Sequence, residues 1–329
     1  MKVLFLGGSG VISSACSALA VERGIELTVL NRGQTATRPL PPAARTVVAD
    51  VRDPAAVRDA LADAEFDAVV DWLAFTPDHI RTALDLFRGR TGQYVFISSA
   101  SAYQTPPERV PVLESTPLRN PFWPYSRDKI ACEDMLVGAY RDEGFPMTIV
   151  RPSHTYDRTL VPFDGGWTVL GRMRAGKEIV VPGDGTSLWT LTHHEDFARA
   201  FVPLLGHPRT LGEAFHITSD DAPTWDQIAR TLAAALGVEA RIVHVPSDAV
   251  AAADPEWGAG LLGDKAHSMV FDNSKVKSVV PGWVATIPFE RGAREIVAWY
   301  DEDPARQRSD AQLDAVMDRL VEAYRPRPL

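Results

Sequence analysis

Residues 2–13 have the sequence KVLFLGGSGVIS: an apolar run, a cluster of glycines and the start of an apolar helix. Glycines at positions 7, 8 and 10 allow a tight turn, and they let a pyrophosphate approach the backbone N–H groups at the start of the helix. The third position of the usual GxxGxxG spacing holds Ser13, which is small enough for close helix–strand packing. This order predicts a strand, a phosphate-binding turn and a helix. The alternative is a tight turn with a purely structural role.

Strand-like and helical stretches alternate along the first half of the chain. The β-rich runs lie at 25–30, 46–49, 66–72, 93–98 and 147–150, and the helical stretches lie at 11–23, 54–63, 78–87 and 125–142. Such alternation is typical of a parallel sheet covered by helices. We therefore predict an α/β fold with a doubly wound parallel sheet, the Rossmann arrangement.

The character of the sequence changes after Arg151-Pro152. Glycine, proline and tryptophan become frequent, the strands at 178–181 and 241–245 are short, and a single helix is predicted between them at 225–236. The tail from residue 303 is charged and predicted to be a helix on the surface. These features predict a smaller C-terminal α+β unit that binds the substrate.

One further strand sets the domain boundaries. Residues 215–218 form a short apolar run that can rejoin the first sheet. We therefore expect residues 1–152 and 191–222 to form the dinucleotide-binding domain. Residues 153–190 and 223–329 would form the substrate-binding domain.

Composition excludes several classes of protein. The chain has 329 residues, and its 34 basic and 43 acidic side chains give a net charge of −9, so no basic excess favours a nucleic-acid partner. Two cysteines, Cys16 and Cys132, cannot make a disulfide scaffold and fit a reducing cytoplasm. No apolar run approaches the roughly 18 residues that a membrane span needs. We expect a cytoplasmic protein that acts on a small molecule, away from membranes.

The end of the second predicted strand bears on the cofactor. An acidic residue there would hold the adenosine ribose hydroxyls and favour NAD, but this chain has Asn31 and Arg32. Arg32 can pair with a 2′-phosphate, so we predict NADP slightly ahead of NAD. The alternative is that Arg32 is a solvent-exposed charge and Asn31 serves the ribose of NAD. Asp50, at the end of the third strand, can accept a hydrogen bond from the adenine amino group.

Tyr125 and Lys129 lie four residues apart in a predicted helix, so their side chains share one face. A nearby ammonium, together with a cationic nicotinamide, favours tyrosinate and lowers the phenol pKa. Such a tyrosine can take a proton from an alcohol while hydride leaves its carbon, or return it. Hydroxyls at Ser99 and Ser101 follow the fifth strand, at the edge of the sheet where ligands bind. The alternative is an exposed Tyr and Lys on a surface helix.

Four motifs occur in an order that is typical of one enzyme family: the glycine turn, SSASAY at 98–103, YxxxK at 125–129 and Arg151-Pro152. The chain resembles the extended short-chain dehydrogenase/reductase family, also called the NAD-dependent epimerase/dehydratase family, over nearly its whole length. The resemblance implies that Ser99 orients the substrate oxygen and that Tyr125 is the acid/base. It implies that Lys129 holds the nicotinamide ribose and tunes the tyrosine. It also implies a homodimer formed through the helix that bears Tyr125.

The predicted site residues fall into two groups. Those predicted to bind the cofactor are Gly7, Gly8, Ser9, Gly10, Val11, Ile12, Asn31, Arg32, Asp50, Val51, Leu73, Ala74, Phe75, Tyr125, Lys129 and Pro152. Those predicted to contact the substrate are Ser99, Ser101, His154, Tyr156, Trp189 and Lys265. No metal is predicted, because the adjacent His193 and His194 cannot easily converge on one ion.

Departures from the family pattern narrow the reaction. Nucleotide-sugar dehydratases of the family carry an Asp-Glu pair directly after the catalytic hydroxyl residue, where this chain has Ala100 and Ser101, so a dehydratase of that type is not expected. Nucleotide-sugar enzymes also carry an arginine, which clamps the diphosphate, at the place of Trp189, and an asparagine at the place of His154. We therefore expect a smaller, less charged substrate such as a sugar or cyclitol. The alternative is a phosphate clamp supplied from elsewhere, by Arg172, Arg174, Lys177 or Lys265.

The sequence thus predicts an NAD(P)-dependent oxidoreductase that moves a hydride between nicotinamide and a secondary alcohol or ketone. The main alternative is a sugar or nucleotide-sugar epimerase with tightly bound NAD. A non-catalytic cofactor-sensing or RNA-binding relative is disfavoured because Tyr125 and Lys129 are both present. Three roles remain possible for His154: it donates a proton, it binds the substrate, or it has a purely structural role. The glycine-rich stretch 257–263, followed by Lys265, predicts a mobile substrate loop or an ordinary surface connection.

Overall fold

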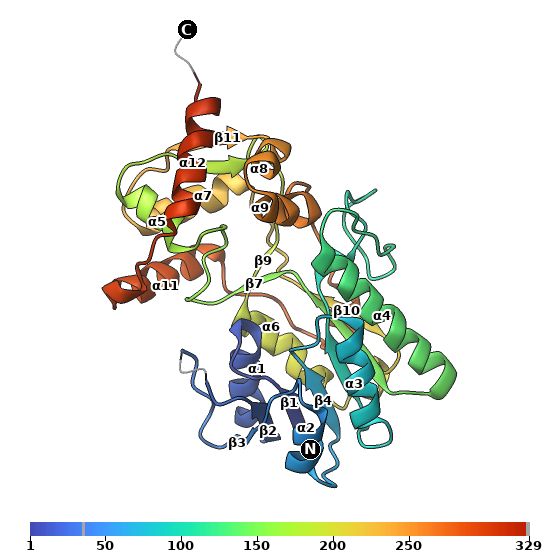
Figure 1. The fold of residues 1–329 in the computed structure, drawn as a ribbon. Coiled ribbons are helices and arrows are strands. Elements are labelled where there is room, and N and C mark those ends of the chain that lie inside the picture. Colours follow the sequence, from blue (N-terminus) through green and yellow to red (C-terminus); the bar gives the residue numbers. More distant parts are fainter. Residues whose placement is uncertain (35–36, 327–329) are drawn as a thin grey trace.

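The computed structural model describes residues 1–34 and 37–326, which form a lower and an upper lobe (Figure 1). The N-terminus lies in the lower lobe and the C-terminal helix in the upper one. Residues 327–329, which end the predicted substrate-binding domain, lie outside the described residues. The domain boundaries stay a prediction.

The lower lobe is built on a parallel sheet of seven strands in the order β10-β6-β5-β4-β1-β2-β3. The strands are β1 (Lys2–Leu6), β2 (Glu26–Asn31), β3 (Arg45–Val48), β4 (Ala68–Asp71), β5 (Tyr94–Ile97), β6 (Met147–Pro152) and β10 (Ala214–Ile217). The late strand β10 pairs with β6, with Phe215 opposite Val150. The predicted doubly wound sheet and the return of this strand are confirmed.

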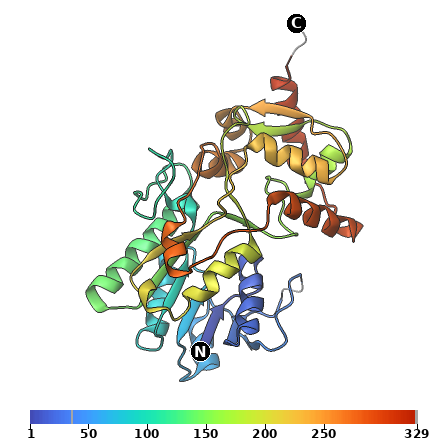
Figure 2. The same cartoon turned by 180° about the vertical axis from the view of Figure 1, so that it is seen from behind.

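Helices cover both faces of the sheet. Apolar residues of α1 (Val11–Glu22) and α6 (His194–Phe201) form the core on one face, which Figure 2 shows from behind. On the other face, α2 (Pro54–Leu61), α3 (Pro77–Phe87) and α4 (Pro124–Glu143) complete a second core. The strand order reverses beside β1, and ligands bind at such a point, outside the carboxyl ends of the strands.

Local sequence explains where α4 begins and ends. Pro124 occupies its first turn, where the missing N–H costs no helical hydrogen bond. Gly144 ends the helix with φ +70°, a conformation that glycine adopts without strain. Tyr125 and Lys129 therefore sit in the first two turns, at the carboxyl edge of the sheet.

The upper lobe has its own hydrophobic core around the parallel pair β8 (Ile179–Pro182) and β11 (Ile242–Val245). A second pair, β7 (His154–Tyr156) and β9 (Leu191–His193), lies between the lobes (Figure 1). The helices of this part are α5 (Trp167–Arg174), α7 (Trp225–Ala235), α8 (Ser247–Ala253), α9 (Pro255–Gly260), α11 (Phe289–Asp301) and α12 (Ala311–Tyr324). The predicted tail helix, α12, packs four apolar side chains into the core of the upper lobe: Val316, Met317, Leu320 and Val321.

Two features differ from the expectations. The glycine-rich stretch predicted as a loop is helical, forming α9 and a π-helical turn at Leu261–Lys265. A glycine is needed inside it because a Cβ on Gly258 would lie 2.3 Å from the Ala251 Cα. In addition, Val276 of α10 (Ser274–Val279) and Trp283 fall in the predicted second domain but pack into the core beneath the sheet.

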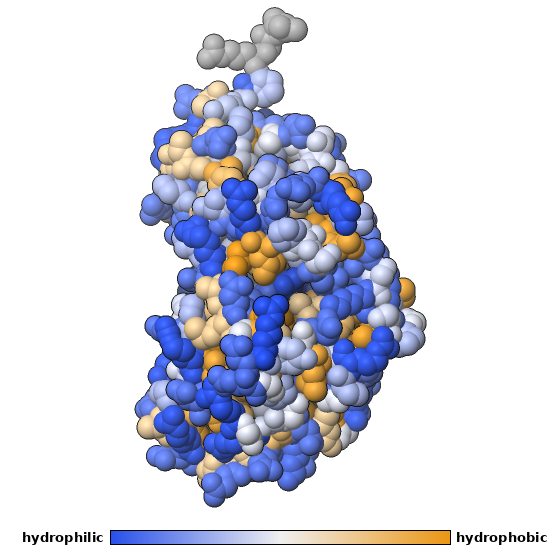
Figure 3. Space-filling model, turned by 90° about the vertical axis from the view of Figure 1, so that its right-hand side faces the viewer, coloured by the Kyte–Doolittle hydropathy of each residue, from blue (hydrophilic) through white to orange (hydrophobic). Residues whose placement is uncertain are grey.

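The surface is mostly hydrophilic, with apolar side chains in small separate groups on the face that Figure 3 shows. Across the described residues, no helix combines the length and the apolar character that crossing a bilayer requires.

Candidate active site

The glycine turn after β1 has the geometry that a phosphate-binding loop needs. Gly7 and Gly8 have φ of +92° and +148°, and a Cβ on Gly8 would lie 2.8 Å from Val29. Ser13, at the third position of the motif, accepts a hydrogen bond from the Gly10 N–H at 2.8 Å. The serine therefore caps the start of α1. It stands at the motif position where the family usually has a glycine.

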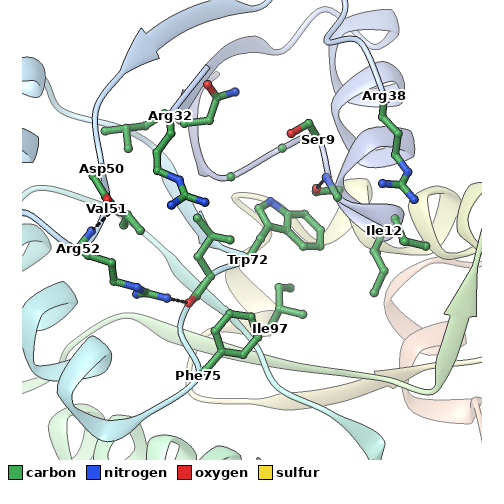
Figure 4. A pocket seen from close by; sticks show the side chains of 18 of the residues that line it. Ser9, Ile12, Arg32, Arg38, Asp50, Val51, Arg52, Trp72, Phe75 and Ile97 are labelled. Carbon is green, nitrogen blue, oxygen red and sulfur yellow. Dashed lines mark hydrogen bonds between the residues drawn. The ribbon is translucent and has the colours of Figure 1, made fainter. Parts of the chain in front are cut away.

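A cavity of about 860 Å³ opens above this turn, at the carboxyl ends of the strands (Figure 4). Nearly all the predicted cofactor residues line it: Gly7 to Ile12, Asn31, Arg32, Asp50, Val51, Leu73, Phe75, Tyr125, Lys129 and Pro152. Ala74 lies beside it and accepts a hydrogen bond from Lys129. Sequence reasoning missed Trp72, Arg38 and Arg52, which also line the cavity.

Arginines gather at the end of the cavity near β2 and β3. Arg32 projects into it (Figure 4) and has no ion pair with any described residue. The Arg52 side chain donates to the Leu73 carbonyl at 2.5 Å, and its backbone N–H donates to the Asp50 carboxylate at 2.9 Å. Arg38 lines the other side of the cavity, beside the start of α1 (Figure 4), and is bound to Asp157 at 2.5 Å.

Lys129 lies at the opposite end of the cavity and is 2% exposed. Its ammonium donates to the carbonyls of Ala74 at 2.6 Å and Ile97 at 2.8 Å. Because an ammonium has three protons, one donor is left for a ligand in the cavity. Burial lowers the pKa of Lys129 to about 8, although the nearby Asp71 carboxylate opposes the shift.

Tyr125 stands beside this lysine, whose Nζ is 5.7 Å from the centre of the phenol ring. Burial raises the pKa of Tyr125 to about 12, and Asp264 adds to the increase, while Ser99 acts in the opposite direction. In the protein without a cofactor, the pKa of Tyr125 is therefore raised, whereas the sequence predicts that Lys129 lowers it. Loss of solvation is the largest cause of the shift, and the Lys129 ammonium is already hydrogen-bonded to two carbonyls.

A row of hydroxyls continues from Ser99 into the protein. The Ser99 and Ser101 side chains are 2.9 Å apart, and Ser126 donates to Ser101 at 2.7 Å. Ser126 is fully buried next to Tyr125 and was not predicted. Its position directly after the tyrosine was the only signal in the sequence. The row fixes the side-chain direction of Ser99 toward the phenol.

A buried ion pair holds α4 against the sheet. The guanidinium of Arg151 in β6 binds the carboxylate of Glu133 at 2.5 and 2.9 Å, and Ser98 donates to the same carboxylate at 2.5 Å. Glu133 is one helical turn beyond Lys129, on the buried face of α4. Together with Ser98, the pair therefore ties α4, which carries the tyrosine and the lysine, to β6 and to the end of β5, which the hydroxyls follow.

The predicted substrate residues do not all meet. The His154 ring lies 4.4 Å from Trp189, and the Lys265 ammonium lies 5.5 Å from the Trp189 ring. Tyr156 instead packs against Phe289 in the core of the upper lobe and is 1% exposed. Alternate side chains of a strand point to the same side, so Tyr156 shares the side of β7 that carries His154. Tyr156 nevertheless lies farther along the strand, in the core of the upper lobe.

His154 is neutral near pH 7. Burial, followed by the charge of Lys265, lowers its pKa to about 3. Its Nε2 is buried and has no hydrogen-bond partner among the described residues. An imidazole in this state can form a hydrogen bond with a ligand but does not act as a charged acid.

The basic residues considered for a phosphate clamp are engaged elsewhere. Arg172 and Lys177 both pair with Asp314 and Asp318, and Arg174 binds Asp301 at 2.6 Å. Lys265 is the member of that group that stays near Trp189.

The first of the two adjacent histidines serves the fold. His193 caps α6 and lies 3.0 Å from Glu295. Within the described ranges, no cluster of three or more potential metal-binding side chains occurs.

Comparisons with known proteins agree with this architecture. The chloroplast stem-loop binding protein of 41 kDa b from Arabidopsis thaliana is 28% identical over 258 residues, which cover 74% of this chain but less than two thirds (65%) of that relative. UDP-glucose 4-epimerase from Lactobacillus helveticus is 27% identical over 246 residues, covering 63% of this chain and 72% of the epimerase.

Solved structures share the fold. Epimerase Mth375 from Methanothermobacter thermautotrophicus has a TM-score of 0.76 at 16% identity, covering 93% of this chain and 94% of that one. UDP-glucose 4-epimerase from Bifidobacterium longum, solved in complex with NAD+ and UDP, has a TM-score of 0.73 at 18% identity, covering 92% and 99%. A sequence profile described as the NAD dependent epimerase/dehydratase family matches residues 3–218. The chain belongs to that family, whose named activities are enzymatic.

Proposed function

We propose that the protein is an NAD(P)-dependent oxidoreductase of the short-chain dehydrogenase/reductase type that interconverts a secondary alcohol and a ketone on a sugar-like or polyol substrate. One observation carries the proposal: Tyr125 and Lys129 line one end of a cavity that begins at a glycine turn, and the Ser99 side chain is within hydrogen-bonding reach of the Tyr125 phenol. This is the arrangement that proton transfer coupled to hydride transfer requires.

The residues present fit a dinucleotide. A Cβ at Gly8 would fill the turn, the start of α1 offers backbone N–H groups, and the cavity runs from Arg32 to Lys129. We propose that Gly7 to Ile12 hold the pyrophosphate and that the third proton of Lys129 binds a ribose hydroxyl. When bound, the nicotinamide accepts or returns the hydride.

The chain's own part in the reaction is proton transfer and orientation. Tyr125 takes the proton from the substrate hydroxyl at its Oη, or gives it to the ketone oxygen in the reverse direction. Ser99 donates a hydrogen bond to the same oxygen and is held by Ser101. Because burial raises the pKa of Tyr125 to about 12, the tyrosinate needs both Lys129 and a cationic nicotinamide beside it.

We propose NADP as the slightly preferred cofactor. Arg32 projects into the cavity without an ion pair among the described residues, and Arg52 lies at the same end (Figure 4). A 2′-phosphate would be neutralised by such a group. The family description names NAD, so calorimetry with both cofactors decides the matter. NAD bound tenfold more tightly than NADP would overturn the preference.

The principal alternative within the family is an epimerase, which regenerates its cofactor in every turnover. UDP-glucose 4-epimerases are among the relatives. Progress curves followed by the absorbance of reduced nicotinamide separate the two: a reductase consumes the cofactor in step with product. An epimerase forms product with no added cofactor and no net absorbance change.

An RNA-binding function has one specific observation in its favour, the similarity to a stem-loop binding protein. The intact Tyr125 and Lys129 and the net charge of −9 support catalysis instead. Mobility-shift titration with a stem-loop RNA at physiological salt tests this alternative. A homodimer through α4, a cytoplasmic location and the two-domain division are further proposals, and sedimentation measures the first.

A further inference from the structure

Arg52 lies across the end of the cofactor cavity near β3 (Figure 4). It follows Asp50 and Val51 in the connection between β3 and α2. Its guanidinium donates to the Leu73 carbonyl at 2.5 Å, just after β4, and its backbone N–H donates to the Asp50 carboxylate at 2.9 Å. Arg52 therefore joins the two segments that enclose this end of the cavity.

The carbonyl that holds Arg52 belongs to a well-fixed turn. The Asp71 carboxylate, 3% exposed, accepts hydrogen bonds from the N–H groups of Leu73 and Ala74, both at 2.8 Å. The buried Tyr94 hydroxyl donates to the same carboxylate at 2.8 Å. These bonds fix the turn, so the guanidinium bound to it is held in place before a ligand arrives.

The Arg52 side chain keeps its flat faces free. Arg52 and Val51 line the cofactor cavity and also a second cavity of about 260 Å³, so Arg52 stands between the two. Arg52 is exposed, and among the described residues no carboxylate forms an ion pair with it and no aromatic ring covers it. The N–H groups of a guanidinium lie in its plane, so the bond to Leu73 uses an edge. The faces of the plane are left for a flat ligand.

An adenine base fits this place. Arg52 binds Oδ1 of Asp50, so Oδ2 is left for the adenine amino group, the contact that the sequence predicts. Val51 and Leu73 add apolar side chains at the same end of the cavity. A guanidinium stacks on an aromatic base through its planar, delocalised cation. Arg32, which no described residue pairs, is the separate group proposed for the 2′-phosphate.

We propose that the Arg52 guanidinium is the platform on which the adenine base of the dinucleotide stacks, and that it adds affinity for adenine nucleotides independently of the 2′-phosphate. The proposal rests on the proposed function in one respect, because it takes the cavity to hold a dinucleotide. Its test measures binding alone and does not depend on turnover.

The experiment is calorimetry on the full chain with NAD, NADP and ADP as probes. We expect Arg52→Met to weaken the binding of all three by the same factor, about twofold to fivefold, the scale of a cation–π contact at an exposed site. Arg52→Lys should show the same loss. Lysine keeps the charge and can still donate to the Leu73 carbonyl, but its ammonium has no plane to stack.

A matched control removes an arginine close by. Arg58 is exposed on α2 and lines neither cavity, so Arg58→Met should leave all three affinities unchanged. This variant measures the effect of losing one positive charge near the site, apart from any contact with the base. Thermal unfolding reports that each variant is folded.

Three results would overturn the proposal: unchanged affinities in Arg52→Met, full affinity in Arg52→Lys, or a loss confined to NADP, which would assign Arg52 to the 2′-phosphate. Failure of the proposed chemistry is visible separately. Turnover that survives Tyr125→Phe would contradict the proposed function, while a loss of ADP affinity in both Arg52 variants would still support the stacking.

Discussion

Replacing Glu133 with glutamine is expected to lower the free energy of unfolding by about 3–5 kcal/mol. The carboxylate is 2% exposed and binds an arginine that is 6% exposed, with a shortest distance of 2.5 Å. The amide of glutamine keeps the shape but removes the charge, so the Arg151 guanidinium is left buried and unpaired. Ser98 also loses a charged acceptor. Urea denaturation measures the loss as a shift in midpoint.

A matched control lies at the C-terminal end of the same helix. Glu143 pairs with Arg88 at 2.6 Å, but the two side chains are 48% and 50% exposed. Glu143→Gln is expected to cost less than about 1 kcal/mol, as exposed pairs do. The double variant Glu133→Gln/Arg151→Met should be more stable than Glu133→Gln alone, since it leaves no unpaired charge. A loss below about 1 kcal/mol for Glu133→Gln would refute the argument that this pair locks α4 to the sheet.

Three further outcomes are expected. Asn120→Ala leaves the buried carbonyls of Ser101 and Gly263 without their donor, so the substrate KM should rise while the cofactor Kd, measured by calorimetry, stays unchanged. Lys129 has a pKa of about 8 in the folded protein and about 10.4 when unfolded. Between these two pH values the unfolded state therefore binds more protons than the folded state. The free energy of unfolding of the wild-type protein, measured relative to that of Lys129→Met, should then rise with pH by about 3 kcal/mol in total. A difference between the two proteins that does not change with pH would contradict this. Arg32→Ala should weaken NADP binding about tenfold and spare NAD, on the scale of one charge-assisted contact; equal losses for both cofactors would show that Arg32 does not read the 2′-phosphate.

The strand–glycine–helix start, the order of the elements and the return of β10 to the sheet were predictable from sequence. Each depends on local periodicity or on a short apolar run beside glycine. The prediction failed at residues 257–263, where glycines indicated a loop. There the absence of side chains serves close packing of Gly258 on Ala251 and of Gly263 on Trp123, and both are tertiary contacts that no local pattern encodes.

In the candidate site, too, local spacing was predictable from the sequence and tertiary contacts were not. Tyr125 and Lys129 share a helix, so their spacing placed them together. Glu133, Ser126 and Asn120 were missed because their partners lie on other elements, and nothing in their neighbouring sequence indicates those partners. Tyr156 was placed in the site from its position near His154, whereas the structure packs it on Phe289.

Tyr125→Phe tests the central claim most directly. The variant removes one hydroxyl from a half-buried ring whose centre lies 4.9 Å from that of Trp123, so the fold and the cofactor cavity should remain. Calorimetry and turnover are measured on the same preparation. We predict that the Kd for the cofactor stays within about twofold, while turnover falls by at least about a hundredfold, the scale of a lost general acid–base group. Turnover equal to that of the wild-type protein, with the cofactor bound, would contradict the account.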